Sequence, residues 1–464
     1  MSLIKSISGI RGTIGGKSGE GLTPPDIVKY AAAYGSWLLS RSEKRHVVVG
    51  RDARVSGEMV SHLVTATLQG LGLHVIDLGL STTPTVEIAV TDEEAAGGII
   101  ITASHNPAQW NALKLLNERG EFLSAADGAQ VLDIAEADDV EFVESKKLGS
   151  YEAKGGYLQK HIEKILALPL VDKKAIEKRN FAIAIDCVNS TGGLAVPMLL
   201  EALGVKRVEK FYCEPDGQFP HNPEPLPENL TFISSKIEKG KFDLGIVVDP
   251  DVDRLVLLTE DGTVFGEEYT LVAVADYVLK HHPGGNTVSN LSSTQALRDV
   301  TEKHGGQYFA SAVGEVNVVE LMKEKGAVIG GEGNGGVIYP ELHYGRDALV
   351  GIALFLTHLA KFGKPATMLR GSYPNYFMSK NKIELTPSID VGSVLDAITQ
   401  KYQKQPINTI DGVKIEFDSQ WVHLRRSNTE PIIRIYTEAE SMVTADNLAR
   451  KLISDIKEII TQKA

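Results

Sequence analysis

Short apolar runs that stop abruptly at polar loops are the feature of this sequence that most constrains its fold. Four of them are HVVVG (46–50), GGIIIT (97–102), FAIAID (181–186) and LGIVVD (244–249), and AVIGGEGNGG (327–336) repeats the pattern. Because successive residues in each run are apolar, both faces of each strand are expected to be buried, as in sheets with helices on both sides. Ligands bind at the carboxyl ends of strands in such sheets, so the polar loops predict a binding site.

Helical patterns and changes in composition divide the chain into segments. Helices are predicted after Ser56, over residues 192–203, and as an amphipathic helix near the end, over residues 443–462. The charged, turn-rich stretch 140–160 is typical of a linker. At roughly 100–200 residues per domain, this length corresponds to three or four domains. We predict α/β domains over 1–150, 151–256 and 257–370, and a smaller α+β domain over 371–464.

The composition excludes several classes of protein. The chain has 464 residues, of which 43% are hydrophobic, and a formal net charge of −12. This acidic balance is against a nucleic-acid binder, but a local group of arginines and lysines can still hold a phosphate. Only two cysteines are present, and no run is apolar enough to cross a membrane. Together with the absence of a secretory signal, these features predict a cytoplasmic protein.

The motif DPDVDRL (249–255) predicts a metal site. Its three carboxylates, Asp249, Asp251 and Asp253, would repel one another unless a hard cation such as Mg²⁺ lay between them. A solvated acidic loop is the simplest alternative. An EF-hand fits less well, because Arg254 stands where a glycine is needed. A haloacid-dehalogenase-type phosphatase with Asp249 as nucleophile is a further alternative.

Two more motifs favour sugar and phosphate binding. In GGEGNGGVIYP (330–340), Glu332 and Asn334 offer hydrogen-bonding groups that suit sugar hydroxyls, and the glycines allow a ligand to come close to the backbone. In VHLRRSNTEP (422–431), the side chains suited to a phosphate dianion are Arg425, Ser427, Asn428 and Thr429. An ordinary turn is the alternative for each loop.

The motif TASHNP (102–107) places Ser104 and His105 at the end of an apolar strand. In extended backbone, neighbouring side chains point to opposite faces, which is against a Ser–His catalytic pair. The hydrolase motif G-x-S-x-G is also missing. We therefore expect Ser104 to offer an exposed hydroxyl that carries a phosphoryl group, with His105 and Lys114 nearby as groups that move a proton or stabilise charge.

Taken together, these motifs resemble the signatures of the α-D-phosphohexomutase family. The matching stretches, in order, are GIRGTIG (9–15), TASHNP (102–107), DPDVDR (249–254), GEGNGG (331–336) and RRSNTEP (425–431). The resemblance covers essentially the whole chain. It implies three α/β domains of shared fold, with mixed sheets covered by helices, and a smaller α+β domain, arranged around a central cleft.

The resemblance also implies a role for each matching residue. Ser104 resembles the serine that is phosphorylated in the active enzyme, Lys114 the general acid/base, and His105 the histidine of the motif. Arg11 and Arg254 resemble the arginines that flank the phosphoserine. A phosphoserine oxygen and three carboxylates resemble the ligands of one Mg²⁺, so the implied metal site comprises Ser104, Asp249, Asp251 and Asp253.

The remaining matches concern the substrate. Glu332 and Asn334 lie on the loop that selects the sugar, and the loop that grips the non-reacting phosphate contains Arg425, Ser427, Asn428 and Thr429. Two departures stand out: Ala112 replaces a glycine common before the lysine, and Gly336 replaces a sugar-contacting histidine of many bacterial members. The Asn334-Gly335-Gly336 loop instead resembles that of archaeal-type phosphoglucosamine and phosphomannose mutases.

The implied reaction moves a phosphoryl group between O6 and O1 of a hexose phosphate, through phosphoserine and a sugar 1,6-bisphosphate. Glucosamine 6-phosphate is the expected substrate, with phosphomannomutase or phosphoglucomutase activity as the alternative. A haloacid-dehalogenase-type sugar phosphatase and a non-catalytic sugar-phosphate sensor are the more distant alternatives. No nucleic acid or membrane is expected as a partner, and the protein is expected to be a monomer or homodimer.

Overall fold

The apolar runs of the sequence form strands in the computed structural model, which describes residues 2–6, 9–237, 240–385, 389–426 and 432–463. The five strands are β3 (His46–Arg51), β5 (Gly97–Ile101), β8 (Ala182–Asp186), β10 (Leu244–Val248) and β14 (Ala327–Glu332). The chain forms two compact units. One comprises residues 1–278 and 334–370, and the other residues 279–333 and 371–464.

The first sheet of the first unit is mixed and has seven strands in the order β1-β2-β6-β5-β3-β4-β7. Its other strands are β1 (Leu3–Ser6), β2 (Gly9–Thr13), β4 (His74–Leu80), β6 (Trp110–Leu116) and β7 (Tyr151–Ala153). β3 runs parallel to β4 and β5, whereas β6 is antiparallel to β5 and β2. β7 lies within the predicted linker and pairs with β4, so part of that stretch belongs to the sheet.

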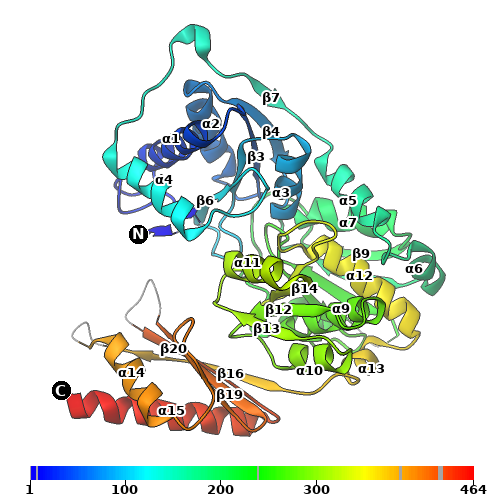
Figure 1. Cartoon of the computed structure of the whole chain (residues 1–464). Coiled ribbons are helices and arrows are strands. Elements are labelled where there is room, and N and C mark those ends of the chain that lie inside the picture. Colours follow the sequence, from blue (N-terminus) through cyan, green and yellow to red (C-terminus); the bar gives the residue numbers. More distant parts are fainter. Residues whose placement is uncertain (1, 7–8, 238–239, 386–388, 427–431, 464) are drawn as a thin grey trace. The chain divides into compact units, whose positions relative to one another are not determined.

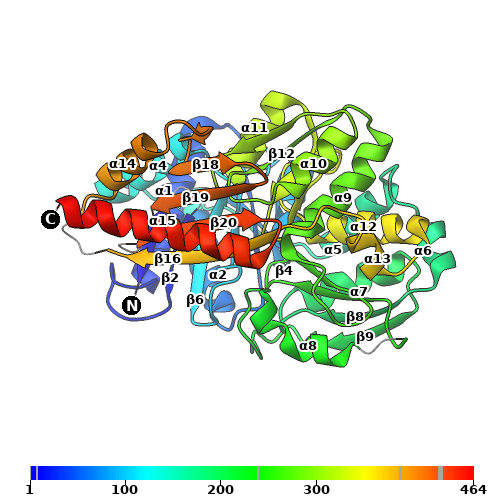
Figure 2. The ribbon, with the colours of Figure 1, turned by 90° about the horizontal axis from the view of Figure 1, so that it is seen from below.

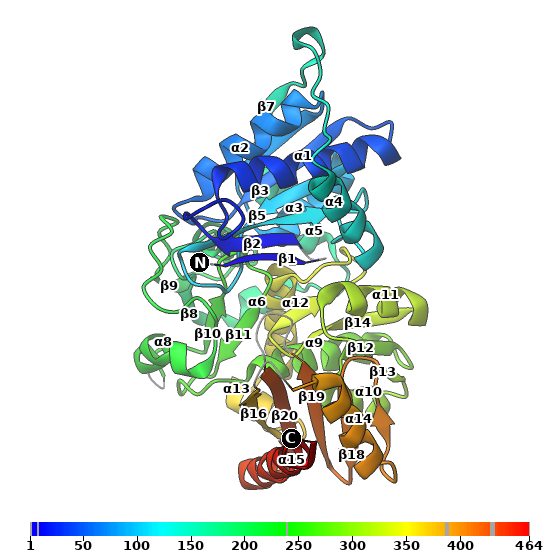
Figure 3. The ribbon, with the colours of Figure 1, turned by 90° about the vertical axis from the view of Figure 1, so that its left-hand side faces the viewer.

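Helices cover both faces of this sheet, as the apolar runs predict. α1 (Pro24–Arg41), α2 (Gly57–Gly70) and α4 (Ala125–Ala137) share an apolar cluster with Val47 and Val49. The intervening Val48 belongs to a second cluster with α3 (Thr83–Asp92). Figure 1 shows α1 and α2 on one side of β3 and β4 and α3 on the other, and Figure 3 shows the molecule from the side of α1 and α2. Ser56 precedes α2 as predicted, but its hydroxyl accepts a hydrogen bond from Asn111 (2.9 Å) and does not cap the helix.

The second sheet of this unit has the order β11-β10-β8-β9, with β9 (Arg207–Phe211) and β11 (Leu255–Leu258) at its edges. β10 is parallel to β8 and antiparallel to β11, so the chain turns back directly after the DPDVDR motif. Helical elements around it are α5 (Tyr157–Ala167), α6 (Lys173–Arg179), α7 (Gly192–Ala202) and α8 (Thr231–Lys236), with the short 3₁₀ turn η2 (Pro227–Asn229) before α8. The other 3₁₀ turn, η1 (Ser145–Lys147), lies near the end of α2 of the first sheet. The unit also contains most of α9 (Glu267–His281) and all of β15 (Gly336–Ile338), α12 (Ala348–Phe362) and α13 (Ala366–Arg370) (Figure 1).

The second unit contains part of an α/β layer and a C-terminal α+β layer. In the first of these, β12 (Asn286–Asn290) is parallel to β13 (Tyr308–Ser311) and to β14, next to α10 (Ala296–Lys303) and α11 (Glu315–Lys325). The C-terminal sheet is antiparallel throughout, in the order β16-β20-β19-β18-β17. Its strands are β16 (Phe377–Glu384), β17 (Ile407–Asn408), β18 (Val413–Phe417), β19 (Gln420–Arg426) and β20 (Ile432–Ala439).

Two helices complete the C-terminal layer. α14 (Val391–Lys401) and α15 (Met442–Lys463) pack one apolar stripe each against the sheet, and Figure 2 shows α15 running along β16 and β20. α15 confirms the predicted amphipathic helix. Within the described parts of the chain, no helix combines the length and apolar character that crossing a membrane requires. The exact limits of the four predicted segments, and the cleft between them, stay predictions.

Candidate active site

Ser104 lies three residues beyond the end of β5 and is only 7% exposed, so the expectation of an exposed hydroxyl is wrong. Its φ is +47°, in the left-handed region that non-glycine residues seldom adopt. The extended backbone expected here is therefore wrong, and so is the expectation that the side chains of Ser104 and His105 point apart. Ser104 Oγ lies 3.3 Å from His105 Nδ1. The strained turn presents the serine hydroxyl and the imidazole on the same side.

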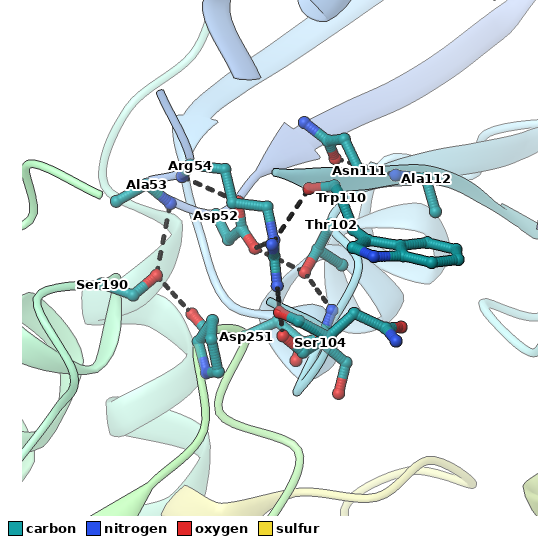
Figure 4. Close-up of polar contacts among 12 residues, drawn as sticks. Asp52, Ala53, Arg54, Thr102, Ser104, Trp110, Asn111, Ala112, Ser190 and Asp251 are labelled. Carbon is teal, nitrogen blue, oxygen red and sulfur yellow. Dashed lines mark hydrogen bonds and ion pairs between the residues drawn. The ribbon is translucent and has the colours of Figure 1, made fainter. Parts of the chain in front are cut away.

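Arg54 fixes the shape of this turn. Its guanidinium donates to four backbone carbonyls of the loop, at 2.5–2.9 Å, which are those of Ser104, Asn106, Pro107 and Trp110. Its Nε donates to Asp52 (3.0 Å), which also accepts from the Thr102 hydroxyl (2.6 Å). Figure 4 shows Arg54 in the middle of the loop. Because every carbonyl satisfied here belongs to the serine loop, Arg54 stabilises the one conformation that displays Ser104.

The three aspartates of the DPDVDR motif follow β10 and meet the serine loop. Ser104 Oγ donates to Asp249 Oδ2 at 2.7 Å. All three carboxylates are fully buried. The prediction that Ser104, Asp249, Asp251 and Asp253 share one site agrees with this geometry within the first unit, although the role of each residue stays a prediction.

Besides the bond from Ser104 to Asp249, one oxygen of each aspartate accepts hydrogen bonds from other protein groups. Asp249 Oδ1 accepts from the backbone N–H groups of residues 253 and 254, both at 3.1 Å. Asp251 Oδ2 accepts from the Thr83 hydroxyl (2.6 Å) and from Lys114 Nζ (2.7 Å). Asp253 Oδ2 accepts from Arg346 Nη2 at 2.6 Å. These contacts fix the rotation of each carboxylate.

The remaining oxygens fit a hard divalent cation. The Oδ1 atoms of Asp251 and Asp253 are buried and have no hydrogen-bond partner in the described parts of the chain. One oxygen from each of the three aspartates lies within 4.8 Å of the others. Buried polar atoms are normally satisfied, and oxygen is the ligand that Mg²⁺ prefers. Burial and the carboxylates of Asp253 and Asp251 raise the pKa of Asp249 well above its usual value, a cost that a bound cation would relieve.

Lys114 and His105 have opposite electrostatic character. Burial alone would lower the pKa of Lys114, but the carboxylates of Asp251 and Asp253 outweigh it and raise that pKa. Burial lowers the pKa of His105 well below its usual value, and the charge of Arg254 adds to the effect. These shifts favour a protonated Lys114 and a neutral His105 at neutral pH.

Ala112, which replaces a glycine common in the family, fits into a regular strand. Ala112 is a buried residue of β6, opposite Arg11 in the adjacent β2. The same strand carries Lys114, opposite Ile100 of β5.

Arg254, one of the two arginines predicted to flank the phosphoserine, follows the last aspartate and forms an ion pair with Glu224 (3.6 Å). Contact of Arg11 and Arg254 with a phosphoserine stays a prediction.

The predicted substrate residues are divided between the units. In the second unit, Glu332 ends β14, and its Oε1 accepts from Asn290 Nδ2 (2.8 Å) and from the N–H of Gly314 (3.1 Å). Arg425 forms an ion pair with Asp411 (2.8 Å) there. In the first unit, Asn334 accepts from the N–H of Gly336 (3.2 Å). Ser427, Asn428 and Thr429 lie outside the described residues.

Known proteins match this chain over nearly its whole length. Family models described as phosphoglucomutase/phosphomannomutase alpha/beta/alpha domains I, II and III match residues 3–141, 159–262 and 266–376, and the C-terminal domain model matches residues 384–454. A phosphoglucomutase/phosphomannomutase of Thermococcus kodakarensis is 37% identical over 436 residues, or 93% of this chain and 94% of that protein. The chain belongs to the phosphoglucomutase/phosphomannomutase family.

Other members of the family support the fold assignment. A phosphoglucosamine/phosphogalactosamine mutase of Sulfurisphaera tokodaii is 29% identical and covers 100% of both chains. The crystal structure of a phosphoglucomutase/phosphomannomutase family protein from Burkholderia thailandensis matches with a TM-score of 0.85 at 26% identity, over 98% of this chain and 97% of that one. The predicted architecture of three α/β domains and a C-terminal α+β domain is confirmed, as is the prediction that the chain is an isomerase of the phosphohexomutase type.

Several residues of the site were missed in the sequence. Arg54 belongs to the RDAR stretch that begins at the last residue of β3, and its place just after an apolar strand is a signal that could have marked it. Thr83 and Arg346 gave no comparable signal. Thr83 is 168 residues from Asp251, and Arg346 is 93 residues from Asp253, so only the fold brings each to its partner.

Proposed function

We propose that this protein transfers a phosphoryl group between O6 and O1 of a hexose phosphate, with Ser104 as the residue that carries it. The observation that supports this most directly is the 2.7 Å hydrogen bond between Ser104 Oγ and Asp249 Oδ2, beside two buried carboxylate oxygens without hydrogen-bond partners in the described parts of the chain. A serine that only stabilised a loop would not need three carboxylates around it.

Phosphoserine 104 would donate its phosphoryl group to a free hydroxyl of the bound sugar phosphate. The bond between phosphorus and Ser104 Oγ breaks, a bond from phosphorus to the sugar oxygen forms, and the proton of that hydroxyl leaves. Neutral His105 can accept this proton, and protonated Lys114 can stabilise charge or return a proton to a leaving oxygen. The product is a sugar 1,6-bisphosphate, whose other phosphoryl group returns to Ser104 after the sugar has turned over.

The aspartates would hold a Mg²⁺ ion. Asp249, Asp251 and Asp253, with an oxygen of phosphoserine 104, would be its ligands, and when bound it would neutralise charge on the phosphoryl group during transfer. Thr83 and Lys114 donate to Oδ2 of Asp251, and Arg346 donates to Oδ2 of Asp253. The phosphate that does not react would bind in the second unit, where Arg425 offers a charged, planar donor.

Glucosamine 6-phosphate, converted to glucosamine 1-phosphate, is the proposed substrate. The GEGNGG loop supports it, since this loop resembles that of archaeal-type phosphoglucosamine mutases. The name of the Sulfurisphaera relative, a phosphoglucosamine/phosphogalactosamine mutase, agrees with it. The name of the Thermococcus relative, a phosphoglucomutase/phosphomannomutase, favours instead the alternative of mannose or glucose phosphates.

A comparison of substrates tests the proposal. The protein is incubated with Mg²⁺, a trace of sugar bisphosphate and each of the 1- and 6-phosphates of glucosamine, glucose and mannose, and Ser104→Ala is measured in parallel. We expect isomerisation by the wild type, fastest with glucosamine phosphates, and none by Ser104→Ala. Release of phosphate without isomerisation, surviving in Ser104→Ala, would support a phosphatase instead. Binding without turnover would support a sugar-phosphate sensor.

A further inference from the structure

The segment that leads into α12 is packed directly against the aspartate loop. The N–H of Ala348 donates to the carbonyl of Val252 (3.1 Å), and Arg346 Nη2 donates to Asp253 (2.6 Å). Val252 lies between two of the aspartates and has a φ of +63°. This conformation is unfavourable for a β-branched residue and persists only where its surroundings enforce it. The hydrogen bonds from residues 346 and 348 help to hold Val252 in this conformation.

Gly336 provides the space through which Arg346 reaches the aspartate loop. A Cβ atom on Gly336 would come within 2.4 Å of Cδ and 3.1 Å of Cγ of Arg346. The atoms concerned lie in the middle of the arginine side chain, so the arginine could not avoid such a Cβ by a small movement of its tip. A glycine at position 336 is therefore a condition for the contact between Arg346 and Asp253.

The backbone on either side of Arg346 is fixed by a buried network. The N–H of Asp347 donates to Val337 of β15 (2.8 Å), and its carboxylate accepts from the N–H groups of residues 349 and 350 at the start of α12. The other carboxylate oxygen lies 2.9 Å from His161 Nε2 and 3.3 Å from His343 Nε2. Because Asp347 is held from three directions, the Cα of the neighbouring Arg346 has little freedom. From this fixed position the Arg346 side chain passes Gly336 to reach Asp253.

We propose that Arg346 is a positioning residue that turns Asp253 so that its Oδ1 faces the cation. Arg346 occupies Oδ2 of this carboxylate, leaving Oδ1 without a hydrogen-bond partner in the described parts of the chain. Outer partners of metal ligands commonly affect metal affinity by about 10–100-fold. Arginine suits this task better than lysine, because its planar group is rigid and always charged. This inference rests on the proposed function, in which the three aspartates bind Mg²⁺.

Equilibrium metal binding tests the proposal without relying on activity. Mg²⁺ is titrated by calorimetry into the wild type, Arg346→Ala, Arg346→Lys and Gly336→Ala, after circular dichroism and thermal unfolding have shown that each is folded. Arg41→Ala is the control, since Arg41 also pairs with a carboxylate (Asp127, 3.0 Å) but is half exposed. We expect Arg346→Ala and Gly336→Ala to weaken Mg²⁺ binding by about 10–100-fold, Arg346→Lys to weaken it less, and Arg41→Ala to have no effect.

The possible outcomes separate this inference from the proposed function. If the wild type and both Arg346 variants bind Mg²⁺ equally well, Arg346 does not position Asp253 and the inference is wrong. If the wild type binds no Mg²⁺, the metal site of the proposed function is wrong. Loss of binding in Arg346→Ala alone, with Gly336→Ala unaffected, would contradict the route proposed for the side chain. If Arg346→Ala does not fold, Arg346→Lys and Gly336→Ala still decide the question.

Discussion

The serine site of the first unit and Arg425 of the second unit are both predicted from sequence motifs, but they are built differently. In the serine site the three carboxylates are fully buried, and Arg54 holds the loop through four carbonyls. Arg425 pairs with Asp411, and the two side chains are 21% and 24% exposed. A partly exposed ion pair is screened by solvent more than a buried one, so we expect a substrate phosphate to compete with Asp411 for Arg425. The groups around Ser104 are fixed by buried contacts, whereas the proposed phosphate-binding residue Arg425 has a partly exposed partner.

Loss of the proposed metal site is expected to have the largest effect. Asp253→Asn removes the charge of one proposed ligand, and loss of several kcal/mol of charge stabilisation corresponds to a fall in kcat of about 100–1,000-fold. Chelation of the wild type with EDTA should abolish activity, and added Mg²⁺ should restore it. The control is Asp133→Asn, an exposed position on α4. Full activity of Asp253→Asn would show that the buried carboxylates are not part of the chemistry.

Removal of Arg54 tests whether the serine loop is held as rigidly as the contacts indicate. Arg54→Ala leaves Asp52 buried without its ionic partner and four loop carbonyls without their donor, so we expect a loss of about 3–5 kcal/mol in the free energy of unfolding. Chemical denaturation measures this loss, with Arg41→Ala as the control. A change below about 1 kcal/mol, the value of an exposed pair, would mean that the loop does not depend on Arg54.

Substitution of Arg425 should affect binding of the substrate more than the chemical step. Arg425→Lys keeps the charge but loses the planar fork that matches a phosphate, so we expect KM to rise about tenfold with kcat nearly unchanged. Steady-state kinetics with the preferred hexose phosphate measures both constants. Arg426→Lys, at the exposed neighbouring position, is the matched control. A fall in kcat without a change in KM would mean that Arg425 acts in the chemical step, and the proposed difference between Arg425 and the serine site would be wrong.

The smallest expected effect on the reaction itself concerns the buried network behind Arg346. Burial alone would lower the pKa of His343, but Asp347 and Glu87 outweigh it and raise this pKa to about 10. The raised pKa adds stability that is fully present below about pH 6.5, the pKa of an unperturbed histidine, and is lost as the pH rises towards 10. Thermal unfolding between pH 6.5 and 10 should show this decline in the wild type and a flatter profile in His343→Gln. Identical profiles would show that His343 is not charged in the native protein.

Local patterns in the sequence were sufficient to predict the strands and the loops that follow them. Residues 46–50 and 97–102 are apolar at successive positions, and such runs are stable only when helices cover both faces of the sheet. The spacing of the three aspartates likewise predicted a common site. In these regions the information that determines the structure is contained in a few consecutive residues.

Features that depend on distant partners could not be predicted in this way. The left-handed backbone of Ser104 is imposed by Arg54, 50 residues earlier, and the extended conformation expected for it was wrong. β7 forms in a predicted linker because β4 offers an edge to which it can pair. Arg346 reaches Asp253 only because Gly336 leaves room for it. This dependence cannot be recognised from the sequence around either residue.

The phosphorylation of Ser104 is the most direct test of the central claim. The wild type and Ser104→Ala are treated with a hexose 1,6-bisphosphate and Mg²⁺, and the peptide containing residue 104 is examined by mass spectrometry before and after addition of a hexose monophosphate. The account predicts one phosphate on Ser104 that passes to the sugar on this addition, and none on the variant peptide. Isomerisation by Ser104→Ala, or by a wild type whose Ser104 never carries phosphate, would contradict it.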